Sequence, residues 1–332
     1  MKSKLKAMTT ALALAGALSA VSVPAHAFIY AQAGVSITDV AIGIGTVNPI
    51  TGGFTLANAR INSFTLSAQD SANLNNTGNV GFSAACSIGT CSTTSPVLDI
   101  SAANGLGGSL NRANNDFTIF GPTNAGSYSN SDAIVRAAQI ITGTPDNLQI
   151  IAESNLAPGG SSALANSTIT SDTGFSLQFT ASGINAFQIS FNASAQATAI
   201  FIDALNPSGN AQAVITTSLL LTNDTTGASA SWRPNGTAGG CFAGGGFVCT
   251  SVVSGTNLNR ASNASSNGAS NPFSGSGPFF LQIAGLTDGN YTLSLATQAR
   301  TVVSRVPEPA SLALMGAGLA GLGFFARKRK QA

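Results

Sequence analysis

Few side chains in the central part of this sequence can do acid–base or nucleophilic chemistry. The single histidine of the 332-residue chain is His26, and the stretch from Phe28 to Val306 contains no lysine. Histidine-dependent triads and a lysine base are therefore excluded from that stretch. It holds eleven carboxylates against seven arginines, a net charge of −4. That balance lacks the basic surface on which binding to nucleic acid depends, so no nucleic-acid partner is predicted.

Carboxylates are the remaining candidates for catalysis, because glycoside hydrolysis needs only a facing pair of them. Glu153 is the only glutamate between Phe28 and Val306, and it follows the apolar run Leu148 to Ala152. Two interpretations stay open. Glu153 is one half of a carboxylate-only glycosidase, or it is a strand-end carboxylate that faces water or pairs with an arginine such as Arg136. We predict no catalytic residue.

The four cysteines form two close pairs, Cys86 with Cys91 and Cys241 with Cys249. Four cysteines permit three pairings, and in an exported protein we expect the two local disulfides, each closing a short loop. The spacings do not match common zinc sites and no histidine is available, so no metal or cofactor is predicted. A calcium site built from separated aspartates stays open.

Two surfaces are candidates for contact with sugars. Trp232 and Arg233 place an aromatic ring beside a hydrogen-bond donor, although packing of Trp232 in the core is the alternative. The second is a row of six uncharged polar residues that share one face of a predicted strand: Gln188, Ser190, Asn192, Ser194, Gln196 and Thr198. This row can hydrogen-bond a hydroxyl-rich polymer or a neighbouring subunit, or it is simply solvated.

Strands must position these residues. From Phe187 to Ala199 every odd position is apolar and every even position is polar, which is the period of a half-buried strand. Phe175 to Ser182 alternates in the same way, and Gly183 to Ala186 suits a hairpin between the two runs. Further candidates are Ile61 to Ala68, Ala133 to Ile141, Leu148 to Glu153, Ala211 to Leu221, Ala228 to Trp232, Phe279 to Ala284 and Tyr291 to Val303.

Many short strands without helical patterns predict an all-β protein, an antiparallel β-sandwich of jelly-roll type. Hydrophobic residues make up 44% of the chain, enough for a core, while only 8% of residues are charged. We expect one large domain over residues 28–305. Thr256 to Gly277 and Asn104 to Asn115 have the composition of long loops, and Phe28 to Ala59 is the hardest region to assign.

The first 27 residues have the three parts of a secretory signal peptide. These are a basic start, an apolar stretch and a small-residue cleavage site, namely Lys2, Lys4 and Lys6, then Ala11 to Val23, then Ala25 and Ala27. We expect cleavage after Ala27, which removes the only histidine. Export to an oxidising compartment follows.

Residues 306–332 also have three parts: a motif, a charge-free stretch and a basic end. They are Pro307, Glu308 and Pro309, then residues 310–326, then Arg327, Lys328, Arg329 and Lys330. The charge-free stretch of seventeen residues would rise about 25 Å as a helix, near the short limit for a hydrocarbon core of about 30 Å. We predict a transmembrane helix whose basic end stays cytoplasmic, leaving the body outside.

This tail resembles the sorting signal of the PEP-CTERM proteins. The resemblance covers only residues 306–332, and it implies a Gram-negative protein whose tail is cut near the motif by an exosortase, in organisms that make extracellular polysaccharide. It further implies an inner-membrane-anchored intermediate and delivery to the cell surface or the biofilm matrix. The implied partners are an exosortase-type enzyme, the inner membrane before processing, and extracellular polysaccharide.

We therefore expect an exported structural protein of the surface or extracellular matrix, without catalysis. Three alternatives stay open: a carbohydrate-binding module, a carboxylate-only glycosidase, and self-assembly through strand edges that few charged residues protect from pairing.

Overall fold

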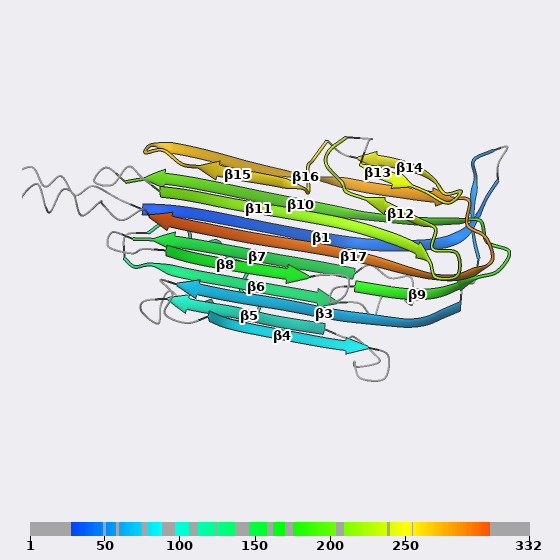
Figure 1. The fold of residues 1–332 in the computed structure, drawn as a ribbon, viewed down its shortest axis with the longest axis horizontal. Helices are drawn as coiled ribbons and strands as arrows, with labels where there is room; N and C mark the ends of the chain where they lie inside the picture. Colours follow the sequence, from blue (N-terminus) through cyan, green and yellow to red (C-terminus); the bar gives the residue numbers. More distant parts are fainter. Residues whose placement is uncertain are drawn as a thin grey trace, which may run out of the picture.

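The structure, a computed structural model, describes residues 28–48, 51–57, 60–74, 79–87, 97–105, 112–123, 125–136, 146–157, 162–169, 175–203, 209–237, 240–253 and 255–305. Over these residues the regular elements are all strands, and they form two antiparallel sheets (Figure 1). The predicted all-β antiparallel sandwich is confirmed. The transmembrane helix predicted for residues 310–326 lies outside the described residues, and within them no helix has the length and apolarity to cross a membrane.

The first sheet, sheet A, contains eight of the described strands, with β1 near its centre. In spatial order, with β2 added beside β1, they are β14 (Val248–Val253), β16 (Ala269–Ala284), β10 (Ala186–Ile202), β1 (Phe28–Val47), β7 (Asp146–Leu156), β6 (Tyr128–Arg136), β5 (Val97–Gly105) and β2 (Phe54–Leu56).

The second sheet, sheet B, contains nine of the described strands and lies against sheet A. In spatial order, with β15 beside β11 and β9 beside β17 and β3, they are β13 (Cys241–Ala243), β12 (Ser229–Trp232), β11 (Gly209–Asn223), β17 (Gly289–Arg305), β8 (Ser162–Ile169), β3 (Arg60–Leu74), β4 (Asn79–Ser87), β15 (Arg260–Ala264) and β9 (Phe175–Ala181). Together the two sheets have more strands than the eight of a jelly roll.

The core lies between the sheets and is built from alternate residues of each strand. In β10 every odd position from Phe187 to Phe201 is buried, while the even positions face outward. β11 and β17 alternate in the same way and supply the opposite wall. The period-two pattern therefore identified both the strand and its buried face correctly.

The chain crosses from sheet B to sheet A between β9 and β10. β9 belongs to sheet B, where it pairs with β17 and β3, whereas β10 belongs to sheet A, where it pairs with β1 and β16. The hairpin predicted at Gly183 to Ala186 is therefore wrong. Both strands carry apolar faces, and these meet across the core: the rings of Phe179 and Phe187 stack with centroids 6.4 Å apart.

The segment Thr256 to Gly277 is not a long loop. It contains β15 and most of β16, and β16 pairs with β10 along its whole length, from Ala284 opposite Ala186 to Ala269 opposite Phe201. Serine and glycine are poor indicators of a strand, but the long partner strand supplies the hydrogen bonds for this backbone. Alternate residues of this stretch, Ser270, Ser274 and Ser276 among them, share the outer face of sheet A with the polar positions of β10, whereas Phe273 packs against the core.

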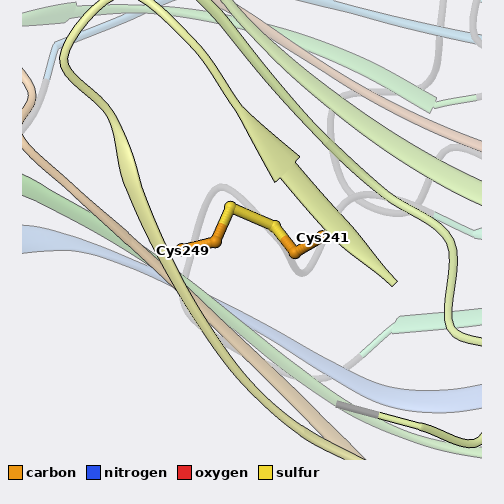
Figure 2. Close-up of a disulfide and its surroundings, with 2 residues drawn as sticks. All are labelled: Cys241 and Cys249. Carbon is orange, nitrogen blue, oxygen red and sulfur yellow. A yellow bond between two sulfur atoms is a disulfide. The ribbon is translucent and has the colours of Figure 1, made fainter. Parts of the chain in front are cut away.

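A disulfide joins an edge strand of sheet A to an edge strand of sheet B (Figure 2). Cys241 lies in β13, the edge of sheet B, and Cys249 lies in β14, the edge of sheet A. This local pairing was predicted, but it joins two sheets rather than closing a loop within one. Cys86 is also disulfide-bonded, and its predicted partner Cys91 lies outside the described residues.

Candidate functional site

A cover segment, residues 112–123 and 125–127, lies over the outer face of sheet A and buries a group of polar side chains. Asn155 of β7 holds it by donating hydrogen bonds from Nδ2 to the carbonyls of Thr123 and Gly126, both at 2.9 Å. The hydroxyl of Tyr128 donates to the carbonyl of Gly121 at 2.6 Å. The side chains beneath point away from the sandwich core, because their chain neighbours on β7 and β6 are core residues.

Glu153 lies under this cover segment with no exposed surface. Its Oε1 accepts hydrogen bonds from the Tyr30 hydroxyl at 2.7 Å and from the Gly121 amide at 3.2 Å. Its Oε2 accepts from the Phe120 amide at 3.2 Å and from the Arg112 guanidinium. Four donors on one carboxylate satisfy it fully.

The arginine that neutralises Glu153 is Arg112, not the Arg136 suggested from the sequence. Arg112 is 4% exposed; it donates further hydrogen bonds to the carbonyls of Asp116 and Thr118, and its guanidinium lies 4.5 Å from the centre of the Phe120 ring. Glu153 is also not at a strand end, because β7 continues to Leu156. The pair fixes the cover segment to the sheet.

Burial shifts the proton equilibria of this group. Desolvation, followed by the negative charge of Glu153, raises the pKa of Tyr30 and of Tyr128 well above the usual value. Burial also raises the pKa of Asp132 to about 7. Asp132 is on β6, and its Oδ2 accepts the backbone amide of Asp116 at 2.7 Å. The tyrosines stay neutral donors, and Asp132 titrates near neutrality.

We expect Asp132→Asn to stabilise the protein in alkaline but not in acidic solution. The folded state keeps a proton up to about pH 7 that the unfolded chain releases near 3.8, so this contribution to stability is fully present below the unfolded pKa and is lost as the pH rises through 7. Asparagine keeps the acceptor without the charge. The gain in unfolding free energy at pH 8 should be about 1–2 kcal/mol, and near zero at pH 4.

Urea unfolding at the two pH values measures this difference, with the exposed Asp224→Asn as the matched control. A variant that is less stable than the parent at pH 8 would contradict the prediction.

A groove lies beside the cover segment on the same outer face of sheet A. Its main hollow measures about 360 Å³ and crosses β7, β1, β10 and β16, within the range of small-molecule sites. A second hollow of about 260 Å³ shares Ser36, Ser194 and Ser276 with it, so the two are continuous. Among the described residues that line both hollows, none carries a charge.

The predicted polar row on β10 borders this groove only in part. Asn192, Ser194 and Gln196 line it, whereas the amide of Gln188 donates to Gln282 across the sheet at 2.8 Å. The opposite wall comes from β16, which the sequence did not identify as a strand there. The alternation in the β10 sequence predicted one wall of the groove, whereas nothing in the local sequence of β16 indicated the other wall.

Trp232 and Arg233 do not form the predicted sugar contact. Trp232 is 1% exposed, and its ring packs in the core at 5.8 Å from the ring of Phe191 and 6.3 Å from that of Phe279. The Trp232 side chain points inward because residues of β12 alternate between its two faces, and Ala230, two positions earlier, is also buried. Arg233 comes after the strand and is exposed. The indole thus offers no face on which a sugar could stack.

The remaining predicted residues lie outside the described part of the chain. They are Ala25 and Ala27 of the signal peptide, Pro307, Glu308 and Pro309 of the motif, and the basic residues Arg327, Lys328, Arg329 and Lys330. Among the described residues, no group of three or more histidine, cysteine or carboxylate side chains is placed to hold a metal ion.

Comparison with known proteins identifies the tail. Residues 305–330 match the family described as the PEP-CTERM protein-sorting motif. No curated protein and no solved structure matches the chain. The match begins at Arg305, the last residue of β17, so the sorting signal follows the sandwich directly. The chain therefore carries a PEP-CTERM protein-sorting motif, which implies an exported protein that is anchored in the membrane before an exosortase processes it.

Proposed function

We propose that this chain is a structural protein of the cell surface or extracellular matrix, with a body that performs no catalysis. The observation that carries the proposal is the order of the parts: a two-sheet sandwich whose last strand runs into the sorting motif. A sandwich with a disulfide across its edges suits an exposed, oxidising location. The motif supplies the route to it.

The state of Glu153 supports the non-catalytic part of the proposal. A glycosidase acid or nucleophile must reach the scissile bond, with a second carboxylate on the other side of it. Glu153 has no exposed surface, and both of its oxygens are occupied by donors of the protein itself. Prolonged incubation of the native protein with the producer's own polysaccharide should release no new reducing ends. Release that Glu153→Gln abolishes would favour the glycosidase.

The proposal is tested by changing the motif in the producing organism. With Pro307, Glu308 and Pro309 replaced by alanine, we expect unprocessed protein to accumulate in the inner-membrane fraction, because the enzyme no longer recognises the tail. Mass spectrometry of the protein from each cell fraction identifies both ends. Pro272→Ala, an exposed change in β16, is the control. Normal processing and surface delivery of the triple-alanine variant would overturn the proposal.

Carbohydrate binding is the second candidate function. The observation that favours it is the uncharged groove on sheet A, not the predicted contact at Trp232.

A further inference from the structure

The groove on sheet A has hydrogen-bonding side chains at regular intervals across the strands. Ser36 of β1 is directly opposite Gln149 of β7 and Ser194 of β10, and Ser194 is opposite Ser276 of β16. These four residues form one row at right angles to the strands. Neighbouring strands are about 4.8 Å apart, so polar groups repeat across the groove at a spacing comparable with one sugar unit of an extended glycan.

The groove is hollow because the residues on its floor are small. Gly34 has no side chain, and Ser36, Ser194, Ser274 and Ser276 have short ones. The cover segment stands beside this floor and contributes Phe117 to the lining. A long, shallow space with hydroxyls below and an aromatic residue at its side suits a flat, polar chain.

The chemistry of the lining discriminates between classes of ligand. Serine hydroxyls and glutamine amides both donate and accept hydrogen bonds, as sugar hydroxyls do. An anionic polymer would need cations, and none of the described lining residues carries a charge. An apolar helix or peptide would need a mainly apolar floor, whereas four serines line this one alongside Ile151 and Phe117.

A buried amide nitrogen next to the groove has no hydrogen-bond partner among the described residues. Gln32 is 3% exposed, and its Nε2 makes no hydrogen bond to any residue that the structure describes. This nitrogen lies 3.4 Å from the position that a Cβ on Gly34 would take, so it points along β1 toward the glycine in the groove floor. A buried donor without an acceptor is destabilising, and a hydroxyl bound over Gly34 would supply that acceptor.

From these observations we propose that the groove binds a neutral polysaccharide chain laid across β7, β1, β10 and β16. The serine row holds its hydroxyls, Phe117 packs against a ring face, and the Gln32 amide gains its acceptor. This binding goes beyond the proposed structural role, and its failure would leave sorting by the tail untouched.

Affinity electrophoresis of the native exported protein tests the proposal. Gels carry one neutral polymer (dextran, hydroxyethyl cellulose or galactomannan) or one anionic polymer (alginate). We expect retardation by at least one neutral polymer, unchanged at high salt because no ion pair contributes, and none by alginate. Retardation by no neutral polymer, or by alginate alone, would overturn the proposal.

Variants with matched controls locate the site. Ser194 is exposed, and Ser194→Leu fills the groove without touching the core; we expect at least a tenfold loss of affinity, which corresponds to about 1.4 kcal/mol. Thr216→Leu, an exposed change on β11 of sheet B, should have no effect. Phe117→Ala should weaken binding about fivefold to tenfold, whereas truncation of Phe242, which is 68% exposed at the edge of sheet B, should not.

A Gln32→Leu variant separates binding from folding. Leucine removes the buried nitrogen that has no described acceptor, so the melting temperature of the free protein should stay unchanged or rise, while binding weakens. Undiminished binding in both Ser194→Leu and Gln32→Leu would overturn the proposal. So would sedimentation showing that the groove is covered by a second copy of the chain and that Ser194→Leu yields monomers.

Discussion

Arg112→Ala is expected to lower the free energy of unfolding by about 3–5 kcal/mol, because it leaves a buried carboxylate without its counterion. Glu153 has no exposed surface, and Arg112 is its only described cationic partner. The substitution also removes donors to two carbonyls of the cover segment. Urea unfolding measures the loss, followed by the fluorescence of Trp232, the single and buried tryptophan.

Two further variants identify the cause of that loss. Arg233→Ala removes an exposed arginine and should change stability by less than about 0.5 kcal/mol. The double variant Arg112→Met with Glu153→Gln removes both charges and should recover much of the loss, since an uncharged pair leaves no ion buried alone. If Arg112→Ala alone costs less than about 1 kcal/mol, the pair does not fix the cover segment.

Trp232→Ala is expected to cost about 3–5 kcal/mol through the cavity that it leaves between the sheets. The ring contacts Phe191 and Phe279 of sheet A from its place on β12 of sheet B. Because this variant has no tryptophan, circular dichroism replaces fluorescence as the probe. Binding to polysaccharide by the folded fraction should be unchanged, since the groove lies on the outer face of the other sheet.

The conservative change at the same position checks this interpretation. Trp232→Phe keeps an aromatic core side chain and removes an indole nitrogen that is buried without a hydrogen bond to the described residues. Its cost should therefore be less than about 2 kcal/mol. Loss of sugar binding in Trp232→Ala at unchanged stability would instead restore the sugar contact predicted from the sequence.

Alternation and apolar runs predicted most of the strands, including parts of β6 and β7, in which residues of both faces are buried. β10 was found because its apolar and polar positions alternate strictly. β1 was not assigned, and its outer face carries Tyr30 and Gln32, which are buried as well. Phe279 to Ala284 at the end of β16 was predicted, but serine and glycine hid its first part, residues 269–277, which pairs with β10.

Tertiary partners were the least predictable part of the site. Glu153 was correctly singled out as the only glutamate of its region, yet its arginine lies 41 residues away along the chain, in a segment with no periodic pattern. The β9–β10 hairpin failed for a related reason. Alternation shows that a strand has an apolar face but not on which of two facing sheets it lies.

The disulfide between β13 and β14 also makes the stability of the sandwich depend on the redox state of these two cysteines. A loop spanning eight positions contributes about 2–3 kcal/mol in the chain-entropy description, a large share of the roughly 5–15 kcal/mol that holds a typical domain together. With both thiols reduced this contribution is absent, and only noncovalent contacts hold the two edge strands together. The reduced protein should therefore unfold more readily than the oxidised one, in which the bond opposes return to an extended chain.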